Sequence, residues 1–428
     1  MPIEMKLKKY KLGELIEVTR GASLSGEYYA TQGEYIRLTC GNFDYHNNCF
    51  KENKSKDNIY YVGKFRDEFL MEEGDIITPL TEQAVGLLGS TALIPESGKY
   101  IQSQDVAKIT CNEKLLDKKF AFYLISSSLV KQQLSAAAQQ TKIRHTSPDK
   151  IKDCVVWIPE MSEQRLIGTL LSTIDQKISL NRQVNHYLEA MAKQLYDYWF
   201  VQFDFPDENG KPYKSSGGKM VWNDKLKREM PEGWELTPLF KGVDVQYGFP
   251  FSTDLFTEIP TDIPIVRIRD IMDGSTSAFY CGDVDDKYRL NKGDVVIGMD
   301  GNFHMNYWHS DMDYLNQRCV RLRPRSDCQI SALQSLFETA PYIKAKEKNA
   351  KGSTVGHLSD KDLKDMWLIK PMSNANFNPR VTFDSLLNKM IQHKEELFQL
   401  TQCRNELLPL LMNGQVSVTQ PNNDLAHD

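Results

Sequence analysis

The chain has 428 residues, of which 41% are hydrophobic and 25% charged, and its formal net charge is -5. This balance is typical of globular proteins: it excludes wholesale disorder and a uniformly basic coat, and the length allows two domains or more. No apolar stretch approaches the roughly 18 residues of a membrane span, the lysine-rich start lacks the apolar core of a signal peptide, and the eight cysteines form no CxxC pair. These features predict a cytoplasmic, multidomain protein with reduced thiols.

The sequence contains an internal repeat of about 200 residues. Leu12–Gly21 matches Leu239–Gly248, 227 positions later, and His145 matches His357, 212 positions later. Further matched positions are Tyr35 with Ile265, Glu73 with Lys292, and Gln104 with Gln317. Because the matches keep their order while their spacing drifts from 227 to 212 positions, a common framework with loop insertions is expected. Two copies of this length predict a duplicated domain.

Short alternating runs of apolar, β-branched and aromatic residues dominate residues 1–160 and 231–372, which predicts strands. The clearest are Val106–Ile109, Val155–Ile158 and Val295–Ile297. Helical patterns interrupt them at Phe120–Leu134 and Ser331–Lys346. The expected fold class is therefore α+β, with two similar globular domains of mixed helix and strand.

Each repeat ends in a long helix, expected within residues 161–205 and 373–415. Apolar residues recur in steps of three and four over about 29 residues, or roughly 43 Å. In the first helix they are Ile167, Leu171, Ile174, Ile178, Leu188 and Leu195, and in the second Phe383, Leu387, Met390, Leu397, Leu408 and Leu411. Such a stripe is more often an ordinary core face. Since both helices end equivalent domains, we predict that they form an antiparallel coiled-coil pair.

Polar residues also occupy this stripe, where they reduce stability and favour one register and one partner: Asn181, Asn185, Lys394, Thr401 and Arg404. The aromatic segment Tyr196–Pro206 is expected to pack the end of the coiled coil, or alternatively to bind a partner. Residues 206–230 are assigned to a linker and 416–428 to a disordered tail, which leaves 1–160 and 231–372 as the two globular domains.

A search for catalytic motifs finds no complete site. The sequence has no GxxxxGK[ST] loop, no HExxH, no GxG turn for adenosylmethionine, and no Asn-Pro-Pro or Asp-Pro-Pro followed by an aromatic residue. Asp149, Asp175 and Lys177 fit a loose PD…(D/E)xK nuclease pattern, but the last two flank the stripe of a predicted helix instead of lying on a strand. The grouping of Cys40, His46 and Cys49 lacks a second ligand pair, so buried thiols are expected and no metal site.

A binding surface remains, in loops at equivalent places of the two repeats. Bulk charge does not indicate DNA binding, but these loops combine cations for phosphate with hydroxyl, amide and imidazole groups that reach base edges. The candidate DNA-binding residues are Lys142, Arg144, His145, Lys351, Ser353, Thr354, His357, Gln83, Asn302 and His304. The loops differ between the repeats, which is what two different specificities require.

The whole chain resembles the specificity (S) subunit of type I restriction–modification enzymes. The resemblance rests on the domain order and on the segments Ser162–Gln164, Tyr198–Asp204, Lys214–Trp222, Met230–Trp234 and Leu407–Gly414. The second repeat departs from the family pattern, with Asn378-Pro379 where the first has Glu163-Gln164. This departure leaves the start of the second helix open.

The resemblance implies two target recognition domains, each reading one half of a bipartite, asymmetric DNA site. It implies that the helix pair sets the gap and docks two methyltransferase (M) subunits, which supply adenosylmethionine and adenine-N6 methylation. Restriction (R) subunits would add ATP- and Mg-dependent translocation and cleavage. The chain itself would be non-catalytic and hold no cofactor. The alternatives are a sequence-indifferent coiled-coil scaffold and a stand-alone DNA-modifying enzyme.

Overall fold

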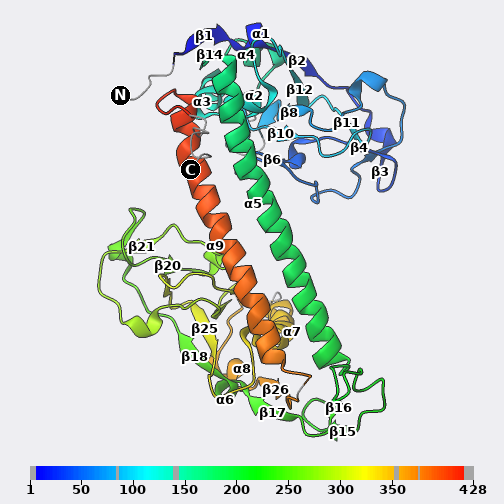
Figure 1. Cartoon of the computed structure of the whole chain (residues 1–428), viewed down its shortest axis with the longest axis vertical. Coiled ribbons are helices and arrows are strands. Elements are labelled where there is room, and N and C mark those ends of the chain that lie inside the picture. Colours follow the sequence, from blue (N-terminus) through cyan, green and yellow to red (C-terminus); the bar gives the residue numbers. More distant parts are fainter. Residues whose placement is uncertain (1–5, 83–85, 138–143, 351–355, 375, 419–428) are drawn as a thin grey trace, which may run out of the picture. The chain divides into compact units, whose positions relative to one another are not determined.

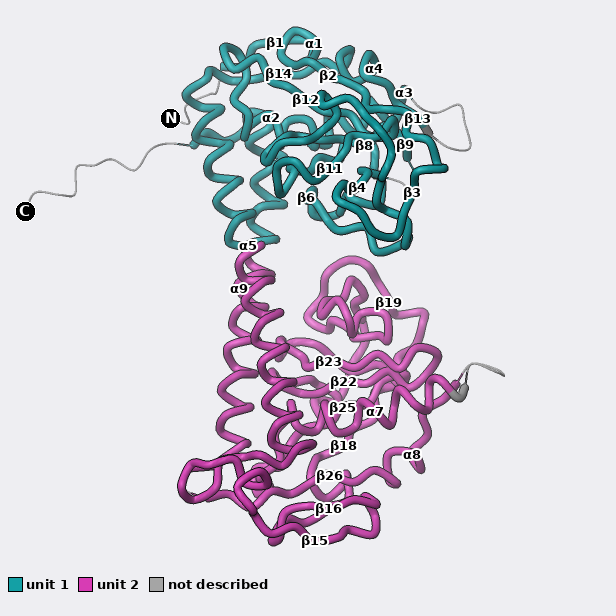
Figure 2. The backbone as a smooth tube through the Cα atoms, turned by 90° about the vertical axis from the view of Figure 1, so that its right-hand side faces the viewer, with its two compact units in different colours: residues 1–177, 400–428 teal, residues 178–399 magenta. Residues whose placement is uncertain are grey.

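The computed structural model of the chain describes residues 6–82, 86–137, 144–350, 356–374 and 376–418. It divides into two compact units, unit 1 (residues 1–177 and 400–428) and unit 2 (residues 178–399), which are coloured separately in Figure 2. Each unit holds one globular part and one segment of each long helix, α5 (Met161–Tyr196) and α9 (Pro379–Met412) (Figure 1). None of the helices in the described ranges is long and apolar enough to cross a membrane.

Unit 1 is built around a four-stranded antiparallel sheet in the order β10-β8-β12-β2. The strands outside the long helices are β1 (Lys8–Lys11), β2 (Ile16–Arg20), β3 (Tyr29–Ala30), β4 (Tyr35–Arg37), β5 (Phe43–Asp44), β6 (Cys49–Phe50), β7 (Tyr60–Tyr61), β8 (Ile76–Pro79), β9 (Thr81–Glu82), β10 (Ala92–Leu93), β11 (Tyr100–Ile101), β12 (Val106–Cys111), β13 (Arg144–His145) and β14 (Val155–Ile158). The short helices are α1 (Leu12–Leu15), α2 (Lys118–Ile125), α3 (Ser128–Ala137) and α4 (Pro148–Lys152).

Unit 2 has the same kind of sheet, in the order β18-β25-β22-β23. Its strands are β15 (Met220–Asn223), β16 (Arg228–Pro231), β17 (Glu235–Pro238), β18 (Val243–Tyr247), β19 (Phe256–Thr257), β20 (Ile265–Val266), β21 (Phe279–Tyr280), β22 (Val295–Gly298), β23 (Met305–Tyr307), β24 (Tyr314–Leu315), β25 (Cys319–Pro324) and β26 (Trp367–Lys370). Its short helices are α6 (Leu239–Gly242) and α8 (Asp360–Lys364), and the longer α7 spans Ala332–Ala350.

The two globular parts repeat one topology, as the sequence predicts. Strand β2 pairs with β12 and β12 with β8 in unit 1, and β18 pairs with β25 and β25 with β22 in unit 2, all antiparallel. The edge pairs β1–β14 and β17–β26 are also equivalent, and so are the parallel pairs β4–β11 and β20–β24. The mixed helix-and-sheet class and the internal repeat are therefore confirmed.

One matched glycine in each repeat is required by close backbone packing. A Cβ on Gly21 would lie 2.4 Å from the carbonyl oxygens of Gln102 and Ser103. A Cβ on Gly248 would lie 2.0 Å from the carbonyl oxygen of Asn316. Since backbone atoms cannot move aside as a side chain can, only glycine fits at the end of these two strands.

In unit 1 the first half of α5 packs against the end of α9. Ile167 and Leu171 share a buried cluster with Leu411 and Met412. Nearer the boundary between the units, the guanidinium of Arg404 donates to the Asp175 carboxylate at 3.0 Å. The Tyr123 hydroxyl of α2 donates to the same carboxylate at 2.6 Å, which ties the helices to the globular part. Because residue numbers rise along α5 as they fall along α9, the two segments are antiparallel.

Unit 2 contains a second polar contact of this kind in the helix pair. The Asn185 side chain donates to the Met390 carbonyl at 3.2 Å. The Tyr307 hydroxyl of β23 donates to Glu189 at 2.9 Å, and the Lys394 ammonium lies 3.8 Å from the centre of the Tyr307 ring. A carboxylate on α5, a cation on α9 and a tyrosine from the globular part therefore meet in each unit. All the predicted stripe residues are buried or half-buried.

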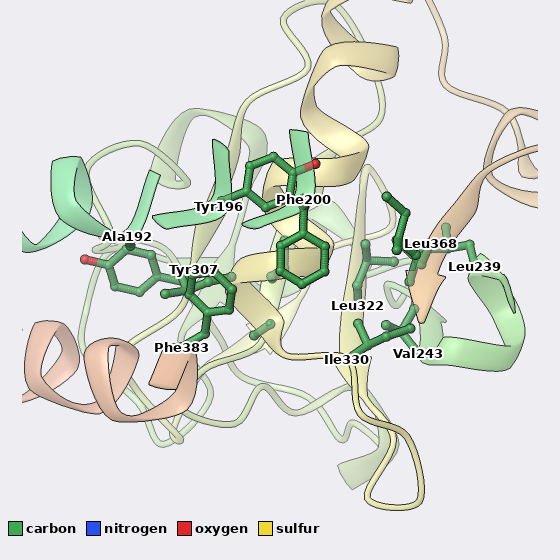
Figure 3. Packing of buried hydrophobic residues seen from close by; sticks show 14 of the residues in the cluster. Ala192, Tyr196, Phe200, Leu239, Val243, Tyr307, Leu322, Ile330, Leu368 and Phe383 are labelled. Carbon is green, nitrogen blue, oxygen red and sulfur yellow. The ribbon is translucent and has the colours of Figure 1, made fainter. Parts of the chain in front are cut away.

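The aromatic segment after α5 belongs to the core of unit 2. After α5, a π-helical turn covers Asp197–Val201. Trp199 and Phe200 are buried and pack against Phe383 of α9. Figure 3 shows Tyr196 and Phe200 in one cluster with Phe383, beside residues of the sheet. The expectation that this segment packs the end of the coiled coil is confirmed.

Three boundaries differ from the sequence-based assignment. Helix α5 ends at Tyr196 instead of near 205, and α9 begins at Pro379 instead of 373, where the Asn378 side chain accepts a hydrogen bond from the Val381 amide. Asparagine at the N-cap followed by proline is a strong helix start. Residues 206–230 contain β15 and most of its hairpin partner β16, and Met230 is buried, so this segment is more than a linker. Residues 419–428 of the expected tail lie outside the described residues.

We predict that Asp175→Ala lowers the free energy of unfolding by about 2 kcal/mol. The side chain of Arg404 is only 9% exposed and would lose its carboxylate partner, which leaves a buried charge uncompensated. The control is Asp153→Ala, which removes an ion pair whose side chains are 61% and 72% exposed and should cost little. Equal losses for both variants in chemical denaturation would contradict the structural role of Asp175.

The pKa of Lys394 falls to about 8 because burial disfavours its charged form. Below pH 8 the folded and unfolded states are both protonated, so the cost of burying the ammonium is present in full. Between pH 8 and roughly 10.5 only the unfolded state keeps the proton, and the wild-type chain gains stability with rising pH. We therefore expect Lys394→Met to be more stable than wild type by about 1–2 kcal/mol at pH 7. Thermal unfolding from pH 7 to 10 should show this advantage shrinking, and a constant difference would contradict the burial argument.

Candidate nucleic-acid interface

The backbone brings three segments of unit 1 together at the end of strand β8. The Leu80 amide donates to the carbonyl of Asp105 at 2.8 Å, and the Thr146 amide donates to the carbonyl of Leu80 at 2.9 Å. Strand β13 pairs with β9, which sets His145 opposite Thr81. We call the side chains of Thr81, Asp105 and His145 at this place junction 1.

Unit 2 repeats the arrangement at the end of β22. The Met299 amide donates to the carbonyl of Arg318 at 2.9 Å, and the Leu358 amide donates to the carbonyl of Met299 at 2.8 Å. A bridge joins Asp300 to His357. We call the side chains of Asp300, Arg318 and His357 junction 2. The same backbone connections thus present different side chains in the two units.

Junction 1 is held by weak, mostly neutral contacts. The Thr81 hydroxyl lies 3.3 Å from Nδ1 of His145 and 3.5 Å from a carboxylate oxygen of Asp105. His145 is exposed, whereas Thr81 and Asp105 are half-buried. The junction therefore offers a hydroxyl, a carboxylate and an imidazole at the surface of unit 1.

Junction 2 is organised by one carboxylate that is mostly buried. Nδ1 of His357 lies 2.6 Å from one oxygen of Asp300, and the Arg318 guanidinium donates to the other oxygen. Burial alone raises the pKa of Asp300, but the hydrogen bonds from His357 and Arg318 outweigh it and leave that pKa below its ordinary value. The side chains of Arg318 and His357 are 63% and 60% exposed, while that of Asp300 is 15% exposed. The carboxylate thus orients two exposed nitrogen groups.

The remaining predicted residues are placed as follows. Arg144 lies in β13 beside His145, and its backbone pairs with Glu82. Asn302 and His304 lie in the turn between β22 and β23, whose Gly301 amide donates to the carbonyl of Gly356 in the His357 segment. Five predicted residues lie outside the described residues: Gln83, Lys142, Lys351, Ser353 and Thr354. The structure brings the two predicted loops of each unit together.

Asp105 and Arg318 were not predicted as site residues. Each follows the glutamine that the repeat matches, Gln104 or Gln317, and this position was the available signal. Arg318 lies three residues before Arg321 in the sequence. The two arginines differ in role, because the side chain of Arg321 is 5% exposed and pairs with Asp244, whereas that of Arg318 is 63% exposed at junction 2.

The nuclease pattern does not form a site. Asp175 is engaged by Arg404 and Tyr123, and Asp149 lies in the short helix α4.

The thiol of Cys40 donates to the carbonyl of Thr81, and burial raises the pKa of this thiol to about 11. Within the described ranges, no three His, Cys, Asp or Glu residues are grouped to hold a metal ion.

Comparison with known proteins identifies relatives. Residues 4–190 match the family "Type I restriction modification DNA specificity domain". The chain is 28% identical to the specificity subunit of the EcoBI type I restriction enzyme of Escherichia coli over 191 residues, covering 44% of this chain and 40% of that subunit. It is 22% identical to the MjaIX specificity subunit of Methanocaldococcus jannaschii over 322 residues, covering 71% of this chain and 70% of that one.

The fold also has a solved counterpart. The crystal structure of the S subunit of a type I restriction–modification system from M. genitalium covers 96% of this chain and 97% of its own, with a TM-score of 0.59 and 16% identity. At this identity the likeness concerns the fold. Residues 4–190 therefore match a type I restriction modification DNA specificity domain, and the chain spans 40% of the length of the E. coli relative. Over the rest of its length the chain is similar to type I specificity subunits.

Proposed function

We propose that this chain is the DNA sequence-specificity subunit of a type I restriction–modification complex. Each globular part would read one half of a bipartite, asymmetric site. The observation that carries this proposal is the pair of junctions: one backbone arrangement occurs twice and presents Thr81, Asp105 and His145 in one unit but Asp300, Arg318 and His357 in the other. Recognition of two different half-sites requires different polar side chains, and the two junctions present such side chains on the same backbone arrangement.

The chemistry of the junctions suits base edges in the major groove. Arginine donors match guanine O6 and N7, carboxylates accept from the amino group of cytosine, and hydroxyls serve either role. Junctions 1 and 2 supply all three groups. The near-neutral bulk charge is compatible with this role if partner subunits make part of the phosphate contacts.

The partners in this proposal are two M subunits and, for cleavage, R subunits. Adenosylmethionine would be held by M, ATP and Mg by R, and the S chain would hold no cofactor and catalyse no reaction. The complex would act in the cytoplasm, where its DNA substrate lies. Helix α5 has 36 residues and extends about 54 Å, so the helix pair is long enough to set a gap of about one DNA turn between half-sites.

Helix α5 offers a surface for such a partner within unit 2. Large exposed side chains recur at steps of seven and four, which places them on one face of α5: Leu180 (59% exposed), Tyr187 (69%) and Met191 (42%), with Tyr198 (37%) following in the π-helical turn. We call this face the outer stripe. Aromatic residues and methionine are enriched in protein interfaces. We therefore assign the outer stripe to M-subunit docking.

Methylome sequencing tests the function directly. A host that expresses this chain with its M partner should acquire a new N6-methyladenine motif with two defined halves and a fixed gap. The same host with M alone should lack that motif. The purified chain alone should neither methylate nor cleave DNA. Co-purification of M with the chain, without any new motif, would instead support a sequence-indifferent scaffold.

Two adjacent substitutions distinguish the role of the outer stripe from that of the buried apolar stripe of α5. Tyr187→Asp should leave thermal unfolding unchanged, because the side chain is 69% exposed, but should weaken co-purification with M by tenfold or more. Leu188→Asp should lower the unfolding temperature by several degrees, because Leu188 packs against the core of unit 2. Wild-type M binding by Tyr187→Asp would exclude the outer stripe as the docking surface.

A further inference from the structure

The two junctions differ most at one position, where unit 1 has Asp105 and unit 2 has Arg318. The amides of Leu80 and Met299 donate to the carbonyls of these two residues at 2.8 and 2.9 Å, so the positions are equivalent in the backbone. An acceptor in one half of the molecule is thus replaced by a donor in the other. This exchange replaces hydrogen-bond acceptors by donors at one position, while the backbone hydrogen bonds around it stay the same.

Arg318 is held in a fixed direction although its side chain is 63% exposed. One of its terminal nitrogens donates to Asp300, whose other oxygen contacts His357. Among the described residues, the Arg318 guanidinium donates only to Asp300. Its other N–H groups have no protein acceptor there and remain available to a ligand, since the side chain is 63% exposed.

This anchoring favours a base contact over a phosphate contact. The Asp300 carboxylate offsets the charge of Arg318, which reduces the long-range attraction to the DNA backbone. What remains is a directed pair of donors, and a flexible cation would serve phosphate better. In the major groove, guanine is the base that presents two acceptors, O6 and N7, to such a fork.

We propose that Arg318 reads a guanine in the half-site bound by unit 2, with Asp300 and His357 as positioning residues. This inference rests on the proposed function. Junction 1 has no arginine at the equivalent place, so the half-site bound by unit 1 is read without this contact. The asymmetry of the recognised sequence thus originates partly from one pair of equivalent positions, Asp105 and Arg318.

The test is methylome sequencing with the full chain and its M partner, comparing wild type with Arg318→Gln and Arg318→Lys. Glutamine matches adenine N6 and N7, so Arg318→Gln should shift one guanine of one half-site toward adenine. Arg318→Lys keeps the charge but loses the fork, and should lower the preference for that guanine about tenfold or more. The other half-site and the gap should stay unchanged in both variants.

Two further variants sharpen the result. Asp300→Asn should relax the same guanine position, because the fork is no longer held by a charged acceptor. The control is Arg66→Gln in unit 1, which removes another exposed, ion-paired arginine and should leave the motif intact. Thermal unfolding of each variant establishes that it is folded.

Three outcomes would overturn the inference. An unchanged motif with uniformly reduced methylation in Arg318→Gln, restored by Arg318→Lys, would assign Arg318 to a phosphate. An unchanged motif at unchanged level in both variants would exclude a DNA contact by Arg318. Both of these outcomes leave the proposed function standing. If the wild-type chain directs no motif at all, the proposed function fails and the inference fails with it.

Discussion

The antiparallel pairing of α5 and α9 is the constraint on which each unit depends. In unit 1 the core of the globular part is completed by Ile167 and Leu171 of α5 and by Leu411 of α9. In unit 2 the same is true of Phe200 and Phe383. Without the helix segments each of these cores would lose part of its apolar cover. The helices therefore complete the core of both globular parts and also pair with each other.

The polar residues of the helix pair give this packing a defined register. A purely apolar stripe allows neighbouring alignments of similar energy, whereas Asp175 must meet Arg404, and Asn185 must meet the carbonyl of Met390. Tyrosines from the globular parts, Tyr123 and Tyr307, complete the polar contacts. Within each unit, the same groups fix the register of the two helix segments and hold the globular part against them.

Much of the architecture was predictable from sequence because it depends on periodicity. The repeat, the α+β class, the strands and the helix stripe each rest on patterns of many residues, and all appear in the structure. The hairpin β15–β16 was missed because its glycine- and serine-rich approach resembles a linker. Alternation along β25 would suggest a solvent-facing Arg321, because the pattern does not reveal the carboxylate of Asp244 with which it pairs.

The candidate site was predictable only in part. The histidines and their loops were chosen because both repeats carry them, and the structure brings the two loops of each unit together. Asp105 and Arg318 lie on a third segment, and their approach to Thr81 and Asp300 follows from strand pairing that a single sequence does not display. The base that each junction would recognise under the proposed function is likewise not encoded in a linear pattern, because the direction and exposure of the side chains decide it.

The division of the chain into units also has a consequence for synthesis on the ribosome. Unit 2 is one continuous stretch, residues 178–399, whereas unit 1 needs residues 400–428 as well as 1–177. At about 5–20 residues per second, synthesis of residues 178–399 takes roughly 10–45 s, and the first 177 residues lack their last segment during that time. During that time Ile167 and Leu171 lack the partners Leu411 and Met412. The nascent chain thus completes its second-made domain before its first, and its earliest apolar surface is the last to be covered.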